Sequence, residues 1–378
     1  MLWCLSVALK RSPQKTTKGI AIPTMEDDST FIRGIFFTLL FLAVLAVGAV
    51  LKVMAEVTLP IVIAVLLALV FHPIVETLHS KFKVPPIIGI SIIFLFVFVI
   101  MFFLGGLLYS SAKTILSLYP KYEERLLTIY LGIADIFNFS YDEELSLISN
   151  IWGQLGIRSS IQKFAFSLSN TLLGFIKNLT VVALFVIFLI TEMGLFKVKA
   201  MAALDGKRPG RISAIIKDIV SQVTRYISIK FFISLLTGMC VYVGTMLISL
   251  DFPIIWGFIA FVLNFIPNFG SIISGVVTTL FALIQFWPRP IPVILVALLI
   301  LATNMILGNF IEPKIQGRNL GISPFIILVS LSVWGWLWGF LGMIVALPMM
   351  VILKIICENI SYLYPISVMI GSKPPRKK

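Results

Sequence analysis

Long apolar runs constrain this chain more than any other feature. Six of them have the roughly 20 residues needed to cross the hydrocarbon core of a bilayer, and they lie at about 34–53, 57–76, 85–109, 171–191, 227–249 and 291–311. Hydrophobic residues make up 59% of the chain and charged residues only 12%, whereas soluble domains carry roughly 25% charged residues. The sequence therefore predicts an all-α polytopic membrane protein with about six full transmembrane helices.

Two further apolar runs are interrupted in the middle. The segment NFIPNFGS at 264–271 breaks the run 253–285, and glycines among tryptophans break the run 324–354. Proline removes a backbone donor and glycine permits sharp bending, so each run predicts a re-entrant or broken helical hairpin. Irregular backbone at membrane depth is tolerated only inside protein or beside a cavity. We therefore expect the functional site near these breaks.

The predicted order of spans and hairpins has an internal symmetry. A span and a hairpin entering from outside occupy 227–285, and a span and a hairpin entering from inside occupy 291–354. Inverted repeats of this kind are typical of transporters that work by alternating access. We therefore expect the two hairpin tips to meet around a site for a small molecule.

Positive charge orients the predicted helices. The loop 193–226, the N-terminal block and the C-terminal tail are rich in Lys and Arg, as cytoplasmic parts of membrane proteins are. Both termini are thus predicted to be cytoplasmic, and the mixed-charge segment 110–170 lies outside. In residues 1–24 the charges follow the hydrophobic residues, so we expect a cytoplasmic tail rather than a signal peptide.

Segment 110–170 has helical apolar spacing among charged residues and predicts a pair of amphipathic helices that lie on the membrane or pack on a neighbouring subunit. The second half of segment 193–226 predicts an amphipathic helix that either rests at the inner interface or serves as a coupling arm between the scaffold and a mobile part. The expected organisation is a cytoplasmic tail 1–30, a transmembrane scaffold 31–192 with the outer segment 110–170, a basic cytoplasmic arm 193–226, a transport unit 227–358 with both hairpins, and a basic tail 359–378.

Enzyme and cofactor motifs are lacking in the sequence. Only His72 and His79 are histidines, the three cysteines are far apart, and no Walker loop, HExxH, CxxC, GxSxG or GxGxxG segment occurs. We expect no enzyme activity, no cofactor and no metal site. The net charge of +13 lies in blocks between apolar runs rather than on a face with stacking aromatics, so no nucleic-acid partner is expected.

Three segments carry a resemblance to a known family. They are LNFIPNFGSIISGV (263–276), GNFIEPKIQGRNLGISP (308–324) and SVWGWLWGFLGMIVALP (332–348), and the chain resembles the autoinducer-2 exporter family of bacterial membrane proteins. The resemblance implies an ATP-independent inner-membrane transporter that works as a homo-oligomer, with a pentamer as one option. It implies export of the quorum-sensing signal autoinducer-2 in some members and sodium or lithium/proton antiport in others.

Polar side chains at the breaks are the candidate substrate ligands. Amide and hydroxyl groups suit a small hydroxylated or uncharged molecule, although Asn and Ser also cap broken helix ends. Asn304 and Asn309 are five residues apart, so we expect at most one of them to face a cavity. The candidates are Asn264, Asn268, Ser271, Asn304 and Asn309.

Glu312 is the candidate for ion or proton coupling, because carboxylates inside membrane segments are costly and commonly functional. It also stands at the end of a span beside Pro313 and Lys314, where an interfacial salt bridge costs little. Backbone-shaping roles fall to Pro267, Gly270, Pro313, Gly317, Gly321, Pro324, Gly339, Gly342 and Pro348.

The expected function is export of a small molecule such as autoinducer-2 across the inner membrane, with membrane lipid and a coupling cation as further partners. A Na⁺(Li⁺)/H⁺ antiporter and a non-transporting membrane scaffold are the alternatives. The antiporter differs by requiring a carboxylate that loses water and titrates.

Overall fold

The computed structural model describes residues 25–136, 178–192, 209–316, 321–360 and 363–372, with single helical positions at 174, 195 and 199. The predictions for the tail 1–24, for 137–170, for most of 193–208, for Gly317 and for 373–378 lie outside the described residues. The chain divides into two units, Met1–Val53 and Met54–Lys378. Helix α1 (Met25–Val53) is the described part of the first unit.

The described residues are helical apart from short turns and one isolated bridge between Ile322 and Gly371. Six helices are long and apolar enough to cross a membrane, which confirms the all-α membrane fold: Ala55–Phe82, Pro86–Leu107, Ser213–Leu247, Phe269–Phe286, Pro290–Gln316 and Pro324–Asn359.

The set of six differs from the predicted set. The predicted spans 34–53 and 171–191 correspond to the shorter apolar helices Phe41–Val53 and Asn178–Glu192. Two of the observed six, Phe269–Phe286 and Pro324–Asn359, belong to the runs predicted as hairpins.

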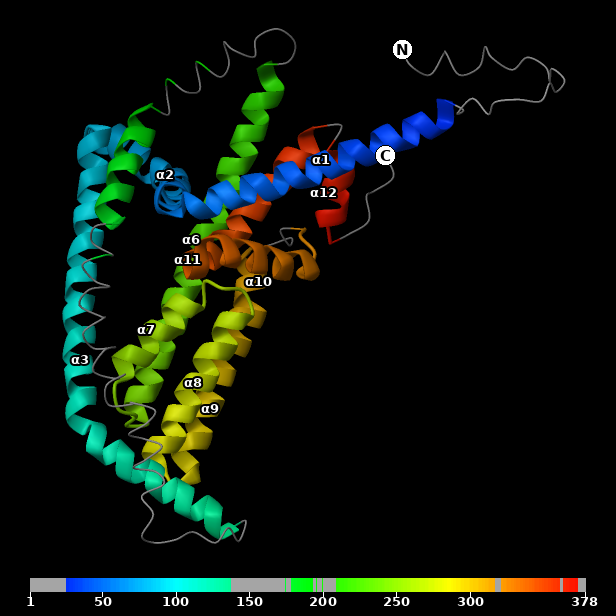
Figure 1. Cartoon of the computed structure of the whole chain (residues 1–378). Coiled ribbons are helices and arrows are strands. Elements are labelled where there is room, and N and C mark those ends of the chain that lie inside the picture. The colour runs from blue at the N-terminus through cyan, green and yellow to red at the C-terminus, as the bar shows by residue number, and fades with distance from the viewer. Residues whose placement is uncertain are drawn as a thin grey trace, which may run out of the picture. The chain divides into compact units, whose positions relative to one another are not determined.

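Helices α2 (Ala55–Phe82) and α3 (Pro86–Ile136) pack with the helix Asn178–Glu192 around one apolar core. Helix α3 is continuous for 51 residues, about 75 Å along its axis, and Figure 1 shows that it bends in its second half. No break separates the predicted span 85–109 from the amphipathic segment that follows. The core residues are Ala64, Ala68, Val75, Ile90, Phe94, Val182, Val186 and Ile190.

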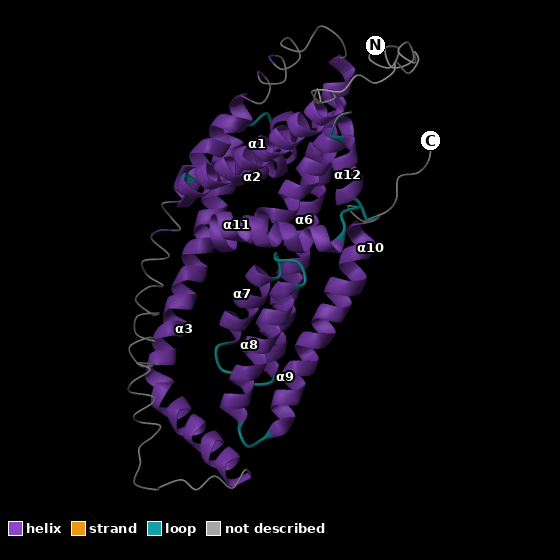
Figure 2. Ribbon diagram, turned by 45° about the vertical axis from the view of Figure 1, so that its right-hand side comes forward, coloured by secondary structure: helices purple, strands orange, loops and turns teal. Residues whose placement is uncertain are grey.

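A second core lies between α6 (Pro209–Leu247), α7 (Pro253–Leu263), α8 (Phe269–Phe286) and α9 (Pro290–Thr303). These four helices lie side by side in Figures 1 and 2. The part of the predicted basic arm from Pro209 on and the span after it form the single helix α6, because apolar helical spacing continues without interruption through Tyr226. The core residues are Val241, Leu250, Trp256, Ala260, Ala282 and Val296.

The first broken run forms the hairpin of α7 and α8. Asn268 precedes α8 with a φ of 63°. A Cβ on Gly270 would collide with the carbonyl oxygen of Leu263, so the chain can turn this tightly only with glycine there. Helix α7 has 11 residues and α8 has 18, so only α8 has the length to cross a bilayer by itself.

The second broken run, α11 (Pro324–Asn359), also folds back on itself. Trp338 and Gly339 leave the helical conformation in its middle. On the two sides of this break, Ser330 Oγ donates to the Ala346 carbonyl at 3.2 Å, and a Cβ on Gly342 would collide with the Trp334 carbonyl. Ile266, at the turn of the first hairpin, packs against Leu331 and Ala346. The first tip therefore meets the flank of the second hairpin, two turns from its break.

Three short elements complete the described chain: the π-helix η1 (Asn304–Ile311), α10 (Glu312–Gln316) and α12 (Tyr364–Ile370). Gly321 has a φ of 66° and its carbonyl accepts from Ser372 N at 2.9 Å. Pro324 opens α11 at a position where its missing N–H costs nothing, whereas Pro348 lies buried inside that helix.

Gly339 allows a direct test of the second break. Its φ and ψ of 63° and −142° suit glycine alone, yet a Cβ there would meet no atom within 4 Å. Gly339→Ala should therefore lower the free energy of unfolding by about 1–3 kcal/mol through backbone strain alone. The measurement is thermal unfolding in detergent.

The matched control is Gly106→Ala in α3, where a Cβ also meets nothing within 4 Å. Since Gly106 lies inside a regular helix, alanine should stabilise it by about 0.5–1 kcal/mol. Equal melting of the Gly339→Ala variant and the unaltered protein would show that the break does not need this backbone conformation.

Candidate functional site

A stripe of buried polar residues follows one face of α6. Successive members are separated by three, four or eight residues, which is the spacing of one helix face. Every member is at most 9% exposed, although the helix is apolar enough to cross a membrane. The stripe consists of Tyr226, Lys230, Ser234, Thr237 and Thr245.

Lys230 and Glu312 form a buried ion pair between α6 and α10. Lys230 Nζ donates to both carboxylate oxygens, at 2.9 and 3.0 Å, and the two side chains are only 6% and 16% exposed. Gln316 Nε2 donates to Glu312 Oε1 at 3.3 Å. Arg225 adds a bond to the Ile315 carbonyl at 3.2 Å. Two side chains of α6, Lys230 and Arg225, therefore hold α10 against α6.

A second polar row faces this stripe from η1 and α10. Asn304, Gly308 and Glu312 follow one another at four-residue spacing, and a Cβ on Gly308 would lie 2.8 Å from Asn304 Oδ1. The absent side chain at Gly308 thus leaves room for the Asn304 amide. The π-helix is wider than an α-helix and keeps these positions on one side.

The hairpin of α7 and α8 reaches the stripe through Asn264. Asn264 Nδ2 donates to Ser234 Oγ at 3.0 Å, and both residues are buried. Asn268 is exposed and makes no side-chain cap hydrogen bond. The Asn264 amide therefore joins the hairpin tip to α6, whereas Asn268 is not part of this contact.

A small cavity lies where the four helices of the second core meet. The centre of a water molecule can occupy about 10 Å³ of it, so the cavity has room for about one water. Several lining hydroxyls donate to carbonyls of their own helices, as Thr278 does to Ser274 at 2.7 Å, so their lone pairs are left for an occupant. The lining residues are Thr237, Val241, Ala260, Ser271, Ser274, Thr278, Ile300, Thr303 and Asn304.

The structure thus brings some predicted site residues together and separates others. Ser271 and Asn304 line the cavity, and Asn264 bonds to Ser234 of the polar stripe. Asn309 is exposed, with its amide on Met305 Sδ at 3.3 Å, so only one of the two predicted asparagines faces the cavity. Glu312 lies at the end of the polar row, and its partner is Lys230 rather than a charge beside it in sequence.

Sequence reasoning missed Lys230 and the hydroxyls Thr237, Ser274, Thr278 and Thr303. Lys230 carried a usable signal, because it is a single charge inside the predicted span 227–249, where ionisable residues are commonly functional. The threonines and serines carried none, since such residues also occur in membrane helices whose hydroxyls bond only to their own backbone.

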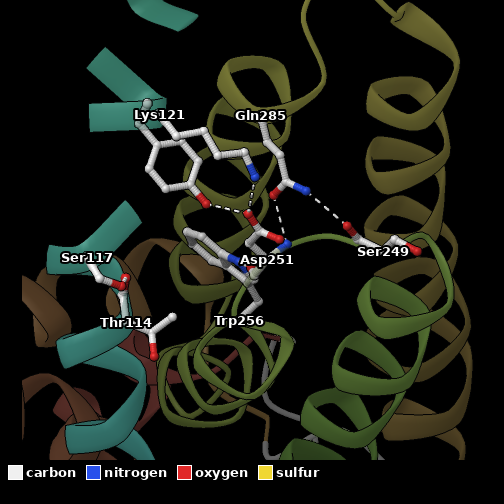
Figure 3. A network of polar contacts seen from close by, with 8 residues as sticks. Thr114, Ser117, Lys121, Ser249, Asp251, Trp256 and Gln285 are labelled. Atoms are coloured by element: carbon white, nitrogen blue, oxygen red, sulfur yellow. Dashed lines mark hydrogen bonds and ion pairs between the residues drawn. The ribbon is translucent and has the colours of Figure 1, made fainter. Parts of the chain in front are cut away.

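A second polar network lies at the other end of the four-helix group (Figure 3). Asp251, in the turn between α6 and α7, accepts from Tyr122 Oη at 2.6 Å and from Lys121 Nζ at 3.3 Å. Gln285 of α8 accepts from Asp251 N at 2.7 Å and donates to the Ser249 carbonyl at 2.9 Å. The α6–α7 turn, helix α8 and helix α3 are therefore joined there.

Comparison with known proteins places the chain in a transporter family. Residues 35–362 match the family described as "AI-2E family transporter". The chain belongs to this family. It is 32% identical to a protein of Borreliella burgdorferi named provisionally as a transport protein, over 90% of this chain and 91% of that protein. It is 28% identical to the AI-2 transport protein TqsA of Escherichia coli, over 81% of this chain and 86% of that protein.

A further relative, from Haemophilus influenzae, is 29% identical over 84% of this chain and 90% of that protein, and it too has only a provisional transport name. The AI-2E family and the names of these relatives indicate transporters rather than enzymes. This chain is thus a multi-pass membrane protein of a bacterial transporter family.

The Lys230–Glu312 pair predicts a strong energetic coupling. Removing one partner of a buried ion pair leaves an uncompensated charge, whereas removing both can be nearly neutral. Lys230→Met and Glu312→Gln should each lower the free energy of unfolding by about 3–5 kcal/mol. The free energy of unfolding of the double variant should fall by much less than the sum of the two single losses.

Thermal unfolding of the four proteins in one detergent measures this cycle. The Lys121–Asp251 pair serves as the control, because its side chains are 48% and 29% exposed and Lys121→Met should cost about 1 kcal/mol or less. Additive losses in the Lys230 and Glu312 variants would show that the pair is not the buried contact described above.

Proposed function

We propose that this protein is an ATP-independent transporter that exports a small uncharged, hydroxylated molecule such as autoinducer-2 across the bacterial inner membrane. The observation that carries the proposal is the pair of facing polar rows, Tyr226 to Thr245 on α6 and Asn304 to Glu312 on η1 and α10, inside helices that can span a membrane. Amides and hydroxyls are the groups that line ligand sites for neutral polar molecules. The named activity of the relative TqsA supports the same reading.

The cavity between α6, α7, α8 and α9 is the proposed binding position. Its lining combines neutral hydroxyl and amide groups with apolar side chains. With room for about one water, it has to widen before a larger molecule can enter. The conformation described here is therefore a closed one, and transport requires these helices to separate.

The packing indicates which helices separate. A Cβ on Gly238 of α6 would lie 2.8 Å from the Gly257 carbonyl of α7, so the two backbones touch and are expected to move together. Contacts across the cavity are made by side chains of α8, α9 and η1. We infer that α8 and α9 move away from the α6–α7 pair.

The Lys230–Glu312 pair favours one alternative, a Na⁺(Li⁺)/H⁺ antiporter. A buried carboxylate beside an ammonium is a common means of coupling ions to conformation. That function differs by requiring a sodium- and pH-dependent flux that Glu312→Gln eliminates. A non-transporting scaffold, the third possibility, would carry no flux at all. In all three cases the protein is proposed to be a homo-oligomer in contact with lipid, with both termini in the cytoplasm.

Transport by purified protein in liposomes tests the proposal. Efflux of autoinducer-2 and sodium-driven proton movement are measured in parallel on the same preparation. Thr303→Val and Asn304→Leu remove polar groups from the cavity lining, and each should reduce efflux about 3- to 10-fold, the effect of one lost hydrogen bond.

Asn309→Leu is the matched control, because Asn309 follows Asn304 on the same element but lies outside the cavity lining. Its efflux should equal that of the unaltered protein. Proton movement without signal efflux would replace the proposal by the antiporter, and absence of both fluxes would leave the scaffold.

A further inference from the structure

Helix α3 continues beyond its membrane segment and contacts the turns at one end of the α6–α9 bundle. The membrane segment is Pro86–Leu107, and we call residues 108–136 the α3 extension. In Figure 3 its side chains reach Asp251 beside Gln285. This is the end of the bundle that the charge pattern predicts to lie outside.

The α3 extension holds both turns of the bundle. Tyr122 Oη donates to Asp251 Oδ2 at 2.6 Å in the α6–α7 turn. Arg125 donates to the Trp287 carbonyl at 2.6 Å in the α8–α9 turn. One rigid helix therefore spans the two turns that must part if α8 and α9 leave α6 and α7.

Tyr122 makes a firm contact rather than a loose surface pair. It is 9% exposed, and its ring lies 5.3 Å from that of Phe281 and 6.4 Å from that of Phe252. Burial, and then the neighbouring Asp251 carboxylate, raise the pKa of the Tyr122 phenol well above its usual value. The phenol therefore stays protonated and keeps donating to Asp251.

Gln285 connects this contact to the cavity. On α8 the residues Ser271, Ser274, Thr278, Ala282 and Gln285 follow at three- or four-residue spacing, so they share one face. The first three line the cavity, and Ala282 is fully buried. Gln285 then closes the row by bonding Asp251 N and the Ser249 carbonyl. Ala282 and the core around it therefore pack between the cavity and this closure.

We propose that the α3 extension is the outer gate of the transport path, with Tyr122 and Arg125 as positioning residues that hold the two turns together. While they hold, α6, α7, α8 and α9 stay joined at this end and the cavity is closed towards the outside. Release of Asp251 and Trp287 is then a required step of export. This inference rests on the proposed transport function, but the closure itself can be measured without a substrate.

The first experiment measures from which side the cavity can be reached. Cys4, Cys240 and Cys357 are replaced by Ala, and Thr237→Cys places one thiol in the cavity lining. A membrane-impermeant thiol reagent is applied to right-side-out and to inside-out vesicles. With the gate intact, labelling from outside should be slow.

The combined variant Tyr122→Phe with Arg125→Gln should speed labelling from outside by roughly 2- to 10-fold for each lost hydrogen bond, while labelling from inside stays the same. Thr128→Val is the matched control on the same helix, since its hydroxyl bonds only the Glu124 carbonyl one turn before. Equally faster labelling from both sides would overturn the proposal, because general loss of structure exposes the thiol to both sides alike. Unchanged labelling in a variant with a normal melting temperature would also overturn it.

The second experiment locks the gate. Lys121→Cys with Asp251→Cys, whose native side chains lie 3.3 Å apart, are joined by a reducible bifunctional thiol reagent in the same cysteine-free protein. Export should stop on cross-linking and return on reduction. Unchanged export by the cross-linked protein would overturn the gate. Absence of export before cross-linking would count against the proposed transport function. In that case the labelling experiment would still decide whether the gate exists.

Discussion

The requirement that every polar group inside a bilayer has a partner underlies the arrangement of this protein. Lys230 shows it most clearly, because a single ammonium in the apolar part of α6 is stable only beside Glu312. That contact fixes the rotation of α6 and the position of α10. It also holds η1 beside α6, where Asn304 and Thr237 line the same cavity.

The tight backbone turns of the transport unit require glycine, which has no side chain. Gly270 lies against the Leu263 carbonyl, and Gly342 lies against the Trp334 carbonyl. In each hairpin the backbone before the turn therefore contacts the backbone after it, and this contact leaves no space for a methyl group. The same device joins α6 to α7 at Gly238 and Gly257. In the proposed opening, α6 and α7 therefore stay together, and α8 remains joined to α7 at the Gly270 turn while the rest of α8 and α9 move.

Run length and charge bias predicted the membrane class and the positions of the two broken runs, because these features are local. Ser271, Asn304 and Glu312 remain predicted site residues, which the structure places in the cavity lining and in the Lys230 ion pair. The predicted element ends at 109 and 226 do not occur, because α3 and α6 each continue as one helix through these positions. Their residues keep helical apolar spacing where the helices leave the apolar zone, so the sequence alone does not show this continuation. The partnership of Lys230 with Glu312 joins residues 82 apart, and no local pattern specifies it. The place of Asn304 in the cavity lining and the exposure of Asn309 likewise result from the packing of several helices, which no local pattern specifies.

Helix α6 links the two ends of the proposed path. Lys230 lies near one end of its polar stripe, and Ser249 and Asp251 follow directly after its other end. The first end is closed by a charged pair within the helices and the second by hydrogen bonds to turns and to α3. We expect these two kinds of contact to respond to different events. An ion pair responds to ions, protons or a polar ligand, whereas a turn responds to movement of the helix that is bound to it. A path closed in two different ways can open one end while the other remains shut, which is the condition that alternating access requires.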